Sequence, residues 1–184
     1  MSITFQDIYT SHEATDWMKQ SFQGFELDSR KVKPGQIFIA LTSLSQPEKT
    51  AQFAQKALEQ GALAVISENE LEVSPNLVVA DVRHLMGQWQ KQYLQATQPV
   101  QAARILAVTG TNGKTTISRL VAEFIMLQGK ACAVMGTTGN GILPNLEASS
   151  HTTLDAMQLQ NALHDYAQAG AEFASIEASS HGLE

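Results

Sequence analysis

The pattern in this chain that most clearly points to chemistry is residues 110–116, Gly-Thr-Asn-Gly-Lys-Thr-Thr. It follows the apolar run 105–108 after one residue. A strand that leads through a glycine-containing loop into a helix is typical of sites that surround the phosphates of a nucleoside triphosphate. Lys114 supplies a charge for the β- and γ-phosphates, and Thr115 supplies a hydroxyl for Mg²⁺. The pattern predicts an ATP site formed by Gly110, Thr111, Asn112, Gly113, Lys114, Thr115 and Thr116.

This loop is shorter than the general phosphate-loop pattern. That pattern has a glycine six residues before the lysine, and this chain has Val108 there. The alternative interpretation is a plain tight turn before a helix. The apolar run upstream and the amphipathic stretch downstream favour the phosphate loop, because that motif requires both.

Glu177 is the candidate carboxylate for the same cation. It follows the apolar or small residues 173–176, which places it at the carboxyl end of a strand, where ligands of open α/β sheets bind. The alternative is a solvated loop carboxylate. We expect Thr115 and Glu177 to hold Mg²⁺, whereas His181 has no spacing that assigns it a role.

Two adjacent threonines, Thr152 and Thr153, precede a helical stretch at about 155–169. One of them could cap that helix, which stabilises it by about 1 kcal/mol. Both could instead bind an anionic group at the helix N-terminus. The residues alone leave these two interpretations open.

Alternating apolar runs and amphipathic stretches predict an α/β protein with right-handed crossovers. A polar stretch with a proline at 97–103 separates two units, so we expect domains at 1–97 and 98–184. The first is expected to be a small mixed-sheet domain. The second has three expected strands, which is half of a parallel-sheet ATPase domain of the P-loop type. Expected strands are 36–41, 62–66, 77–80, 105–108, 131–135 and 173–176, and expected helices are 53–58, 85–93, 117–127 and 155–169.

The composition and charge limit the classes of protein to which the chain can belong. The chain has 184 residues and a net charge of −6, which gives no basic surface for nucleic acid or for an anionic membrane. No apolar run approaches the length of a transmembrane helix. Cys132 is the only cysteine, which fits a reducing cytoplasm and a small core residue. Trp89 and Tyr93 keep helical spacing and are expected in a core.

Five segments, in order, give the chain a resemblance to a known family. They are 27–30 (Leu-Asp-Ser-Arg), 108–116, 135–141 (Met-Gly-Thr-Thr-Gly-Asn-Gly), 152–153 and 177–183 (Glu-Ala-Ser-Ser-His-Gly-Leu). Together they resemble the Mur ligases, and most of all the branch that adds the third residue of the peptidoglycan stem peptide. The resemblance extends from about residue 27 to residue 184.

The resemblance implies an ATP-dependent acid–amino-acid ligase of the cytoplasm, monomeric in its full-length form. The first domain would bind the UDP of UDP-N-acetylmuramoyl-L-alanyl-D-glutamate through Leu27 and Ser29. Lys114 and Glu177 would be catalytic, with Glu177 serving Mg²⁺, and Thr152, Thr153 and Ser179 would contact the muramoyl dipeptide. The γ-phosphoryl group of ATP would pass to the D-glutamyl carboxylate, and the amine of a diamino acid would attack the resulting acyl phosphate. Diaminopimelate and lysine are both used in the family, and diaminopimelate is the commoner.

The chain departs from the family pattern in several places. Leu154 stands where many relatives have proline, Ala178 where many have valine, and residues 43–48 lack the usual Asp-Gly-His signature. This sequence lacks the later half of the family's pattern, which contains a carbamylated lysine and an amino-acid-binding domain. We therefore expect an N-terminal fragment. Two alternatives are a related folate or polypeptide amide ligase and a non-catalytic nucleotide-binding module.

Overall fold

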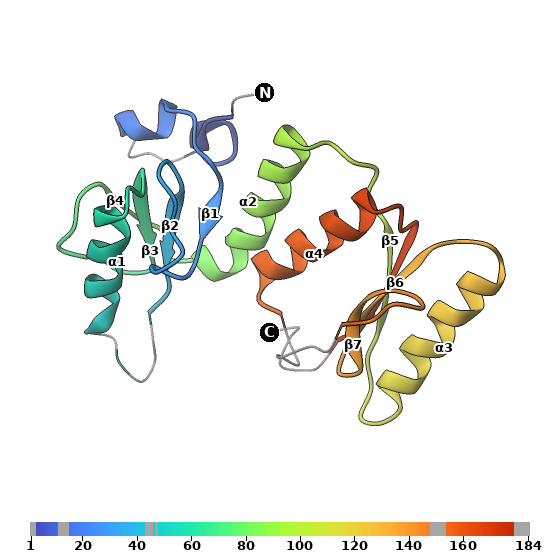
Figure 1. The fold of residues 1–184 in the computed structure, drawn as a ribbon. Helices are drawn as coiled ribbons and strands as arrows, with labels where there is room; N and C mark the ends of the chain where they lie inside the picture. The colour runs from blue at the N-terminus through green and yellow to red at the C-terminus, as the bar shows by residue number, and fades with distance from the viewer. Residues whose placement is uncertain (1–2, 11–14, 43–45, 47, 148–153, 179–184) are drawn as a thin grey trace. The chain divides into compact units, whose positions relative to one another are not determined.

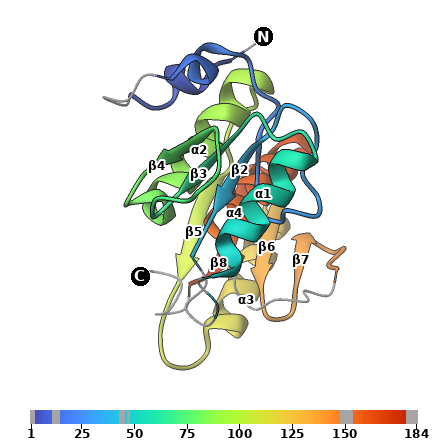
Figure 2. The same ribbon diagram turned by 90° about the vertical axis from the view of Figure 1, so that its left-hand side faces the viewer.

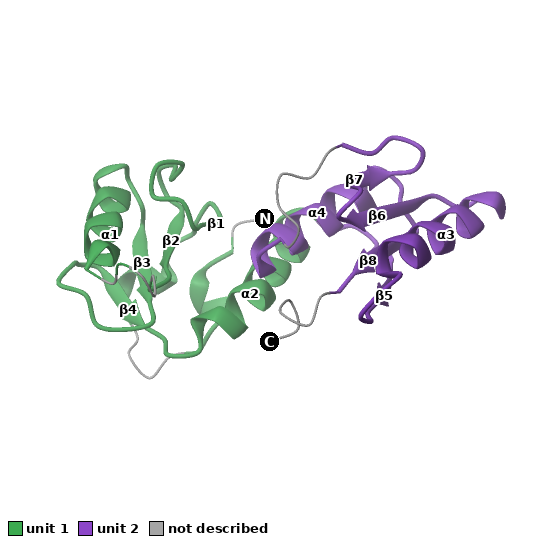
Figure 3. Ribbon diagram, turned by 90° about the horizontal axis from the view of Figure 1, so that it is seen from below, with its two compact units in different colours: residues 1–98 green, residues 99–184 purple. Residues whose placement is uncertain are grey.

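The computed structural model describes residues 3–10, 15–42, 46, 48–147 and 154–178. The chain divides into two compact units, residues 1–98 and 99–184 (Figure 3). The division falls one residue from the boundary expected at 97. The α/β class predicted from the sequence is confirmed, and each unit is built around a four-stranded sheet.

Unit 1 has a parallel sheet in the order β1-β2-β3-β4 (Figure 1). Its strands are β1 (Phe25–Glu26), β2 (Ile37–Ala40), β3 (Ala64–Ser67) and β4 (Asn76–Val78). The expectation of a mixed sheet is wrong for these strands, because all three pairings between them are parallel. Each of the first three strands is followed by a crossover that returns the chain to the same end of the sheet, as parallel pairing requires.

Two helices cover the faces of this sheet. Helix α1 (Lys49–Glu59) packs Ala54 and Ala57 against Phe38 and Val65, and Figure 2 shows it lying in front of β2. Helix α2 (Val82–Thr97) lies on the other side, as Figure 1 shows. All four residues of β2 and of β3 are buried, because both faces of these strands are covered.

An aromatic cluster completes the core of unit 1. Trp89 of α2, which is 2% exposed, meets Phe5 and Phe25 with ring centroids 5.3 and 6.3 Å apart. Phe5 belongs to the short 3₁₀ helix η1 (Phe5–Asp7), and a second one, η2 (Asp16–Lys19), adds Trp17. The expected core position of Trp89 is confirmed.

Unit 2 has a mixed sheet in the order β5-β8-β6-β7. Its strands are β5 (Arg104–Val108), β6 (Cys132–Gly136), β7 (Gly139–Ile142) and β8 (Phe173–Glu177). Strands β5, β8 and β6 are parallel, whereas β7 pairs antiparallel with β6. The expectation of three strands therefore missed β7, which returns directly from β6 after only two residues.

Helices α3 (Lys114–Leu127) and α4 (Ala156–Gln168) cover opposite faces of the second sheet (Figure 1). Ala122 of α3 packs on Cys132 and Val134, while Leu163 of α4 packs against the cluster that contains Ala133 on the opposite face. Cys132 is 1% exposed, so its expected core position is confirmed.

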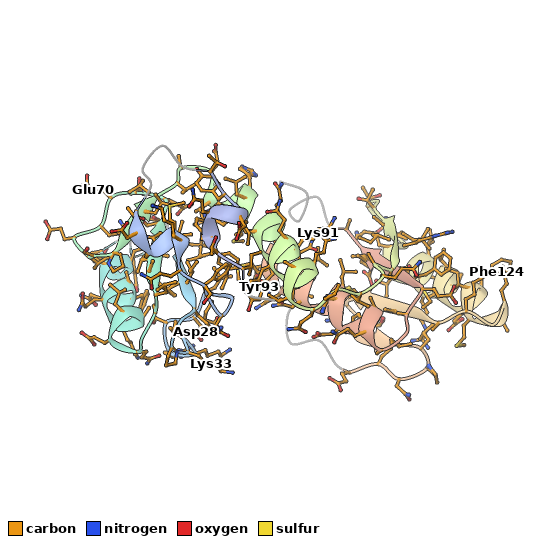
Figure 4. All side chains as sticks on the ribbon, turned by 90° about the horizontal axis from the view of Figure 1, so that it is seen from above. Asp28, Lys33, Glu70, Lys91, Tyr93 and Phe124 are labelled. Atoms are coloured by element: carbon orange, nitrogen blue, oxygen red, sulfur yellow. The ribbon has the colours of Figure 1, made fainter. Side chains whose placement is uncertain are left out.

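One surface of unit 2 is apolar and open to solvent. Strand β5 is a sheet edge, and α3 beside it exposes 57% of Leu120 and 66% of Phe124. Phe124 is labelled in Figure 4. Leu106, Leu120, Phe124 and Phe173 line a groove of about 560 Å³ there. We call Leu106, Leu120, Phe124 and Leu127 the apolar face of unit 2.

Among the residues that the structure describes, no helix is both long enough and apolar enough to cross a bilayer.

Candidate functional site

The predicted phosphate loop lies between the end of β5 at Val108 and the start of α3 at Lys114. Gly110 has φ +149° and Gly113, the N-cap residue just before the helix, has φ +77°. These are backbone conformations that residues with a Cβ rarely adopt, so glycine is needed at both positions. The loop therefore delivers the N-terminus of a 14-residue helix to the carboxyl edge of the sheet, where its free N–H groups attract anions.

Lys114 is the first residue of α3 and folds back over its own loop. Its Nζ donates a hydrogen bond of 2.7 Å to the carbonyl oxygen of Gly110. The ammonium thus lies beside the loop backbone and forms no ion pair with any residue that the structure describes. A contact of this kind on an exposed side chain is readily exchanged for a phosphate oxygen, which is a stronger, charged acceptor.

Glu177 is brought to the same edge by strand pairing. It ends β8, and the register places it directly opposite Val108, the last residue before the loop. Thr115 Oγ1 donates a hydrogen bond of 2.9 Å to Glu177 Oε2, although 62 residues separate the two in sequence. The two residues expected to share a cation therefore lie in contact.

Thr137 is a third member of this group that sequence reasoning did not single out. Its Oγ1 lies 3.0 Å from Thr115 Oγ1 and 3.3 Å from Glu177 Oε1, and its N–H donates to Glu177 Oε1 at 3.2 Å. The preceding Gly136 leaves room for this, because a Cβ there would collide with the Glu177 carboxylate. The sequence signals were its position after strand 131–135 and its place in the segment 135–141 that carries the family resemblance. Its proximity to Glu177 depends on β6 lying beside β8.

The convergent oxygens of Thr115, Thr137 and Glu177 fit a magnesium ion. Mg²⁺ prefers oxygen ligands and is usually held by one or two carboxylates together with substrate phosphates and waters. Within the described residues, no group of three or more His, Cys, Asp or Glu side chains could hold a metal. The donor set thus suits a cation that arrives with a nucleotide better than one held by protein alone.

A buried hydrogen bond fixes the two elements that carry this site. Ser175 Oγ, in the middle of β8, donates to the carbonyl oxygen of Ser118 in α3 at 2.9 Å. Both serines are fully buried. Because the bond joins the strand of Glu177 to the helix of Thr115, it helps to hold these two side chains in position.

In unit 1, the segment 27–30 follows β1 at the carboxyl edge of that sheet. Glu26 Oε1 accepts hydrogen bonds from the N–H groups of Leu27 and Asp28, at 2.9 and 3.0 Å. The Arg30 guanidinium donates hydrogen bonds to both carboxylate oxygens of Asp28. These hydrogen bonds hold the pKa of Asp28 well below its ordinary value. Ser29 is 5% exposed. Asp28 is labelled in Figure 4.

Three expected substrate contacts, Thr152, Thr153 and Ser179, lie outside the described residues, as does His181. The structure does decide which residue caps α4. Asp155 is the N-cap, and its Oδ1 accepts from the N–H groups of Met157 and Gln158. The interpretation of Thr152 or Thr153 as that cap is therefore wrong.

Comparisons with known proteins agree with this geometry. Residues 108–184 match the family described as Mur ligase middle domain. A Haemophilus influenzae (strain 86-028NP) protein named UDP-N-acetylmuramoyl-L-alanyl-D-glutamate--2,6-diaminopimelate ligase is 43% identical over 169 residues, covering 85% of this chain and 33% of that protein. A Vibrio vulnificus (strain YJ016) protein of the same name is 40% identical over 167 residues, covering 88% and 34%.

Solved structures give the same result. One titled as a UDP-N-acetylmuramoyl-L-alanyl-D-glutamate--2,6-diaminopimelate ligase matches with a TM-score of 0.95 and 66% identity, covering 100% of this chain and 37% of that one. The MurF ligase of Thermotoga maritima, solved with ADP, shares the fold at a TM-score of 0.56 and 19% identity, covering 91% and 34%. The resemblance seen in the sequence is confirmed, and the chain spans about one third of the length of its curated relatives.

Proposed function

Because the chain belongs to the Mur ligase family, we propose that it is part of an ATP-dependent ligase of peptidoglycan precursor synthesis. The enzyme adds a diamino acid, meso-diaminopimelate, to UDP-N-acetylmuramoyl-L-alanyl-D-glutamate in the cytoplasm and acts as a monomer. The observation that carries the proposal is the contact of Thr115 and Glu177 beside the loop of Lys114.

In this proposal unit 2 binds ATP with Mg²⁺. The backbone from Gly110 to Thr116 surrounds the phosphates, and Lys114 neutralises the oxygens of the transferring group. Thr115 and Glu177 would hold Mg²⁺, which would stabilise the charge that develops on those oxygens. A carboxylate is a poor electrophile, so a D-glutamyl carboxylate oxygen first attacks the γ-phosphorus of ATP, which releases ADP and gives an acyl phosphate. The amine then attacks the acyl carbon, phosphate leaves, and loss of a proton from the amine nitrogen gives the amide.

Unit 1 binds the UDP end of the substrate at the carboxyl edge of its sheet, with Leu27 and Ser29 at the nucleotide. The hydrogen bonds around Glu26 and Asp28 support this proposal, because they fix the backbone of the segment before a ligand arrives. Thr152, Thr153 and Ser179 are proposed contacts of the muramoyl dipeptide, based on the family pattern.

The cation site can be tested with two matched glutamates on one strand. Glu177 ends β8, and the exposed Glu172 precedes its other end, about 16 Å away along an extended chain. We expect Mg²⁺ to strengthen ATP binding to the 184-residue chain, measured by calorimetry. Glu177→Gln should remove most of this gain, whereas Glu172→Gln should retain it. A Glu177→Gln chain that is folded and keeps the full effect of Mg²⁺ contradicts the assignment.

A second experiment tests whether the whole reaction needs more than these two units. Incubated with UDP-N-acetylmuramoyl-dipeptide, MgATP and diaminopimelate, the 184-residue chain is expected to make no tripeptide detectable by mass spectrometry. Holding the acyl phosphate and the amine together supplies roughly 7–11 kcal/mol of such a barrier. The chain spans only 33% of its relative, so we expect the amine to be held by the remainder. Multiple turnovers would show that the apparatus is complete here.

A further inference from the structure

A second network of charged side chains lies in unit 1, outside the residues assigned above. Glu68 Oε2 accepts a hydrogen bond of 2.6 Å from the N–H of Thr42, and an Arg83 terminal nitrogen donates to the carbonyl oxygen of Thr42 at 2.9 Å. Arg83 also forms an ion pair with Glu68, with Nε 2.5 Å from Oε1. We call Glu68 and Arg83 the Thr42 clamp, because together they hold both backbone polar groups of one residue.

The clamp joins three neighbouring strands at one edge of the sheet. Thr42 follows the end of β2, Glu68 is the first residue after β3, and Arg83 lies in the first turn of α2, after β4. Asn69 adds a hydrogen bond of 3.3 Å to the Thr42 hydroxyl. All of these residues lie at the carboxyl ends of parallel strands, which is where ligands bind in open α/β sheets.

The lowered pKa of Glu68 indicates that the clamp is an ion pair of two charged groups at neutral pH. The Glu68 side chain is 17% exposed. This burial opposes its ionisation, but hydrogen bonds from Arg83 and from the Thr42 N–H outweigh it and lower the pKa of Glu68. Arg119 and Glu123 form the contrasting case, since they pair with each other along one exposed helix turn. The clamp instead directs two charged groups to the backbone of a residue 26 and 41 positions away.

The residue that the clamp holds follows the strand beside the one that leads into the proposed nucleotide segment. Strand β1 pairs in parallel with β2, with Glu26 opposite Phe38, so the chain leaves both strands at the same edge. Residues 27–30 follow β1, and Thr42 follows β2. Neighbouring strands are about 4.8 Å apart, so the two segments leave the same end of the sheet from adjacent strands.

We propose that Glu68 and Arg83 are positioning residues for nucleoside diphosphate binding. By fixing the backbone of Thr42, they keep the chain on the β2 side of the proposed UDP site, which includes Leu27 and Ser29, in place before the ligand arrives. Binding energy then need not be spent on ordering that part of the chain. The inference rests on the proposed binding of UDP by unit 1, and the clamp itself need not touch the ligand.

The test is a titration of UDP into the 184-residue chain, followed by amide chemical shifts. Arg83→Met removes the guanidinium and keeps the length of the side chain, and we expect it to weaken UDP binding about tenfold. Glu68→Gln keeps one acceptor for the Thr42 N–H and is expected to have a smaller effect. Arg119→Met, which breaks the ion pair in unit 2, is the matched control and should bind UDP like the unaltered chain.

The readouts separate the clamp from a general effect on folding and from the proposed function. In each variant the amide shifts of Ile39 and Val65 in the core should stay unchanged. If the unaltered chain does not bind UDP, the proposed function of unit 1 is wrong. If it binds, and folded Arg83→Met and Glu68→Gln chains bind equally well, the clamp has no positioning role. If Arg83→Met does not fold, Arg83→Lys and Glu68→Gln decide, and unchanged affinity in both overturns the inference.

Discussion

Replacing Lys114 by alanine should separate nucleotide binding from folding. The Lys114 ammonium has one described hydrogen bond, to the Gly110 carbonyl, at the exposed start of α3. Losing a surface contact of this kind changes the free energy of unfolding by about 0.5 kcal/mol or less. Losing a charged hydrogen bond to phosphate costs about 1.5–3 kcal/mol. Since each 1.4 kcal/mol is tenfold, one such contact corresponds to about 10- to 100-fold weaker ATP binding. Contacts to both the β- and γ-phosphates make the upper end the expected result.

Lys130 provides the matched control for this experiment. It follows the other end of α3, a helix of 14 residues and therefore about 21 Å long. Lys130→Ala removes the same charge from the same unit but leaves the loop intact. ATP titration by calorimetry and urea unfolding should be measured for both variants. A folded Lys114→Ala chain that binds ATP as tightly as the Lys130→Ala chain would refute the phosphate-loop assignment.

Three further outcomes follow from the contacts described above. Asp155→Ala leaves two N–H groups at the start of α4 without their acceptor, so urea unfolding should show a loss of about 1 kcal/mol that the exposed Asp165→Ala does not. The chain should self-associate through its apolar face, and the double change Leu120→Ser and Phe124→Ser should reduce the mass seen by light scattering during size-exclusion chromatography; an unchanged mass contradicts this. Because the pKa of Glu68 is lowered on folding, its contribution to stability is present above its ordinary value of 4.5 and is lost as pH falls below it. Urea unfolding measured from pH 7 to pH 3 should therefore show a smaller loss of unfolding free energy for Glu68→Gln than for the unaltered chain.

The sequence predicted the elements whose signal lies within a few neighbouring residues. The apolar runs of β2, β3 and β6 are visible because burial on both faces makes such strands almost continuously apolar. Strand β5 has an equally apolar run, although most of it is exposed at the edge of the sheet. Strand β7 was missed because Gly139 and Gly141 replace the side chains that would mark it. Strand β1 has only two residues, too few for any periodicity.

The candidate site also has a part with a local sequence signal and a part that depends on the order of the strands. Gly110 to Thr116 could be predicted because loop, charge and hydroxyl are consecutive in sequence. Glu177 could be placed at a strand end, but its contact with Thr115 depends on β8 lying beside β5. Thr137 depends in addition on β6 lying on the other side of β8. Strand order is set by packing across the whole unit, and no local pattern in the sequence encodes it.

The hydrogen bond from Thr115 to Glu177 also determines what a cation must displace. The carboxylate accepts hydrogen bonds from the Thr115 hydroxyl and from the Thr137 N–H, so both of its oxygens already have donors from the protein. A divalent ion that takes up both side-chain oxygens has to turn the Thr115 proton outward, exchanging an internal hydrogen bond for a shared ligand. Chelating agents should therefore weaken nucleotide binding while the fold persists, because strand pairing and the hydrogen bond between Ser175 and Ser118 hold these side chains in place.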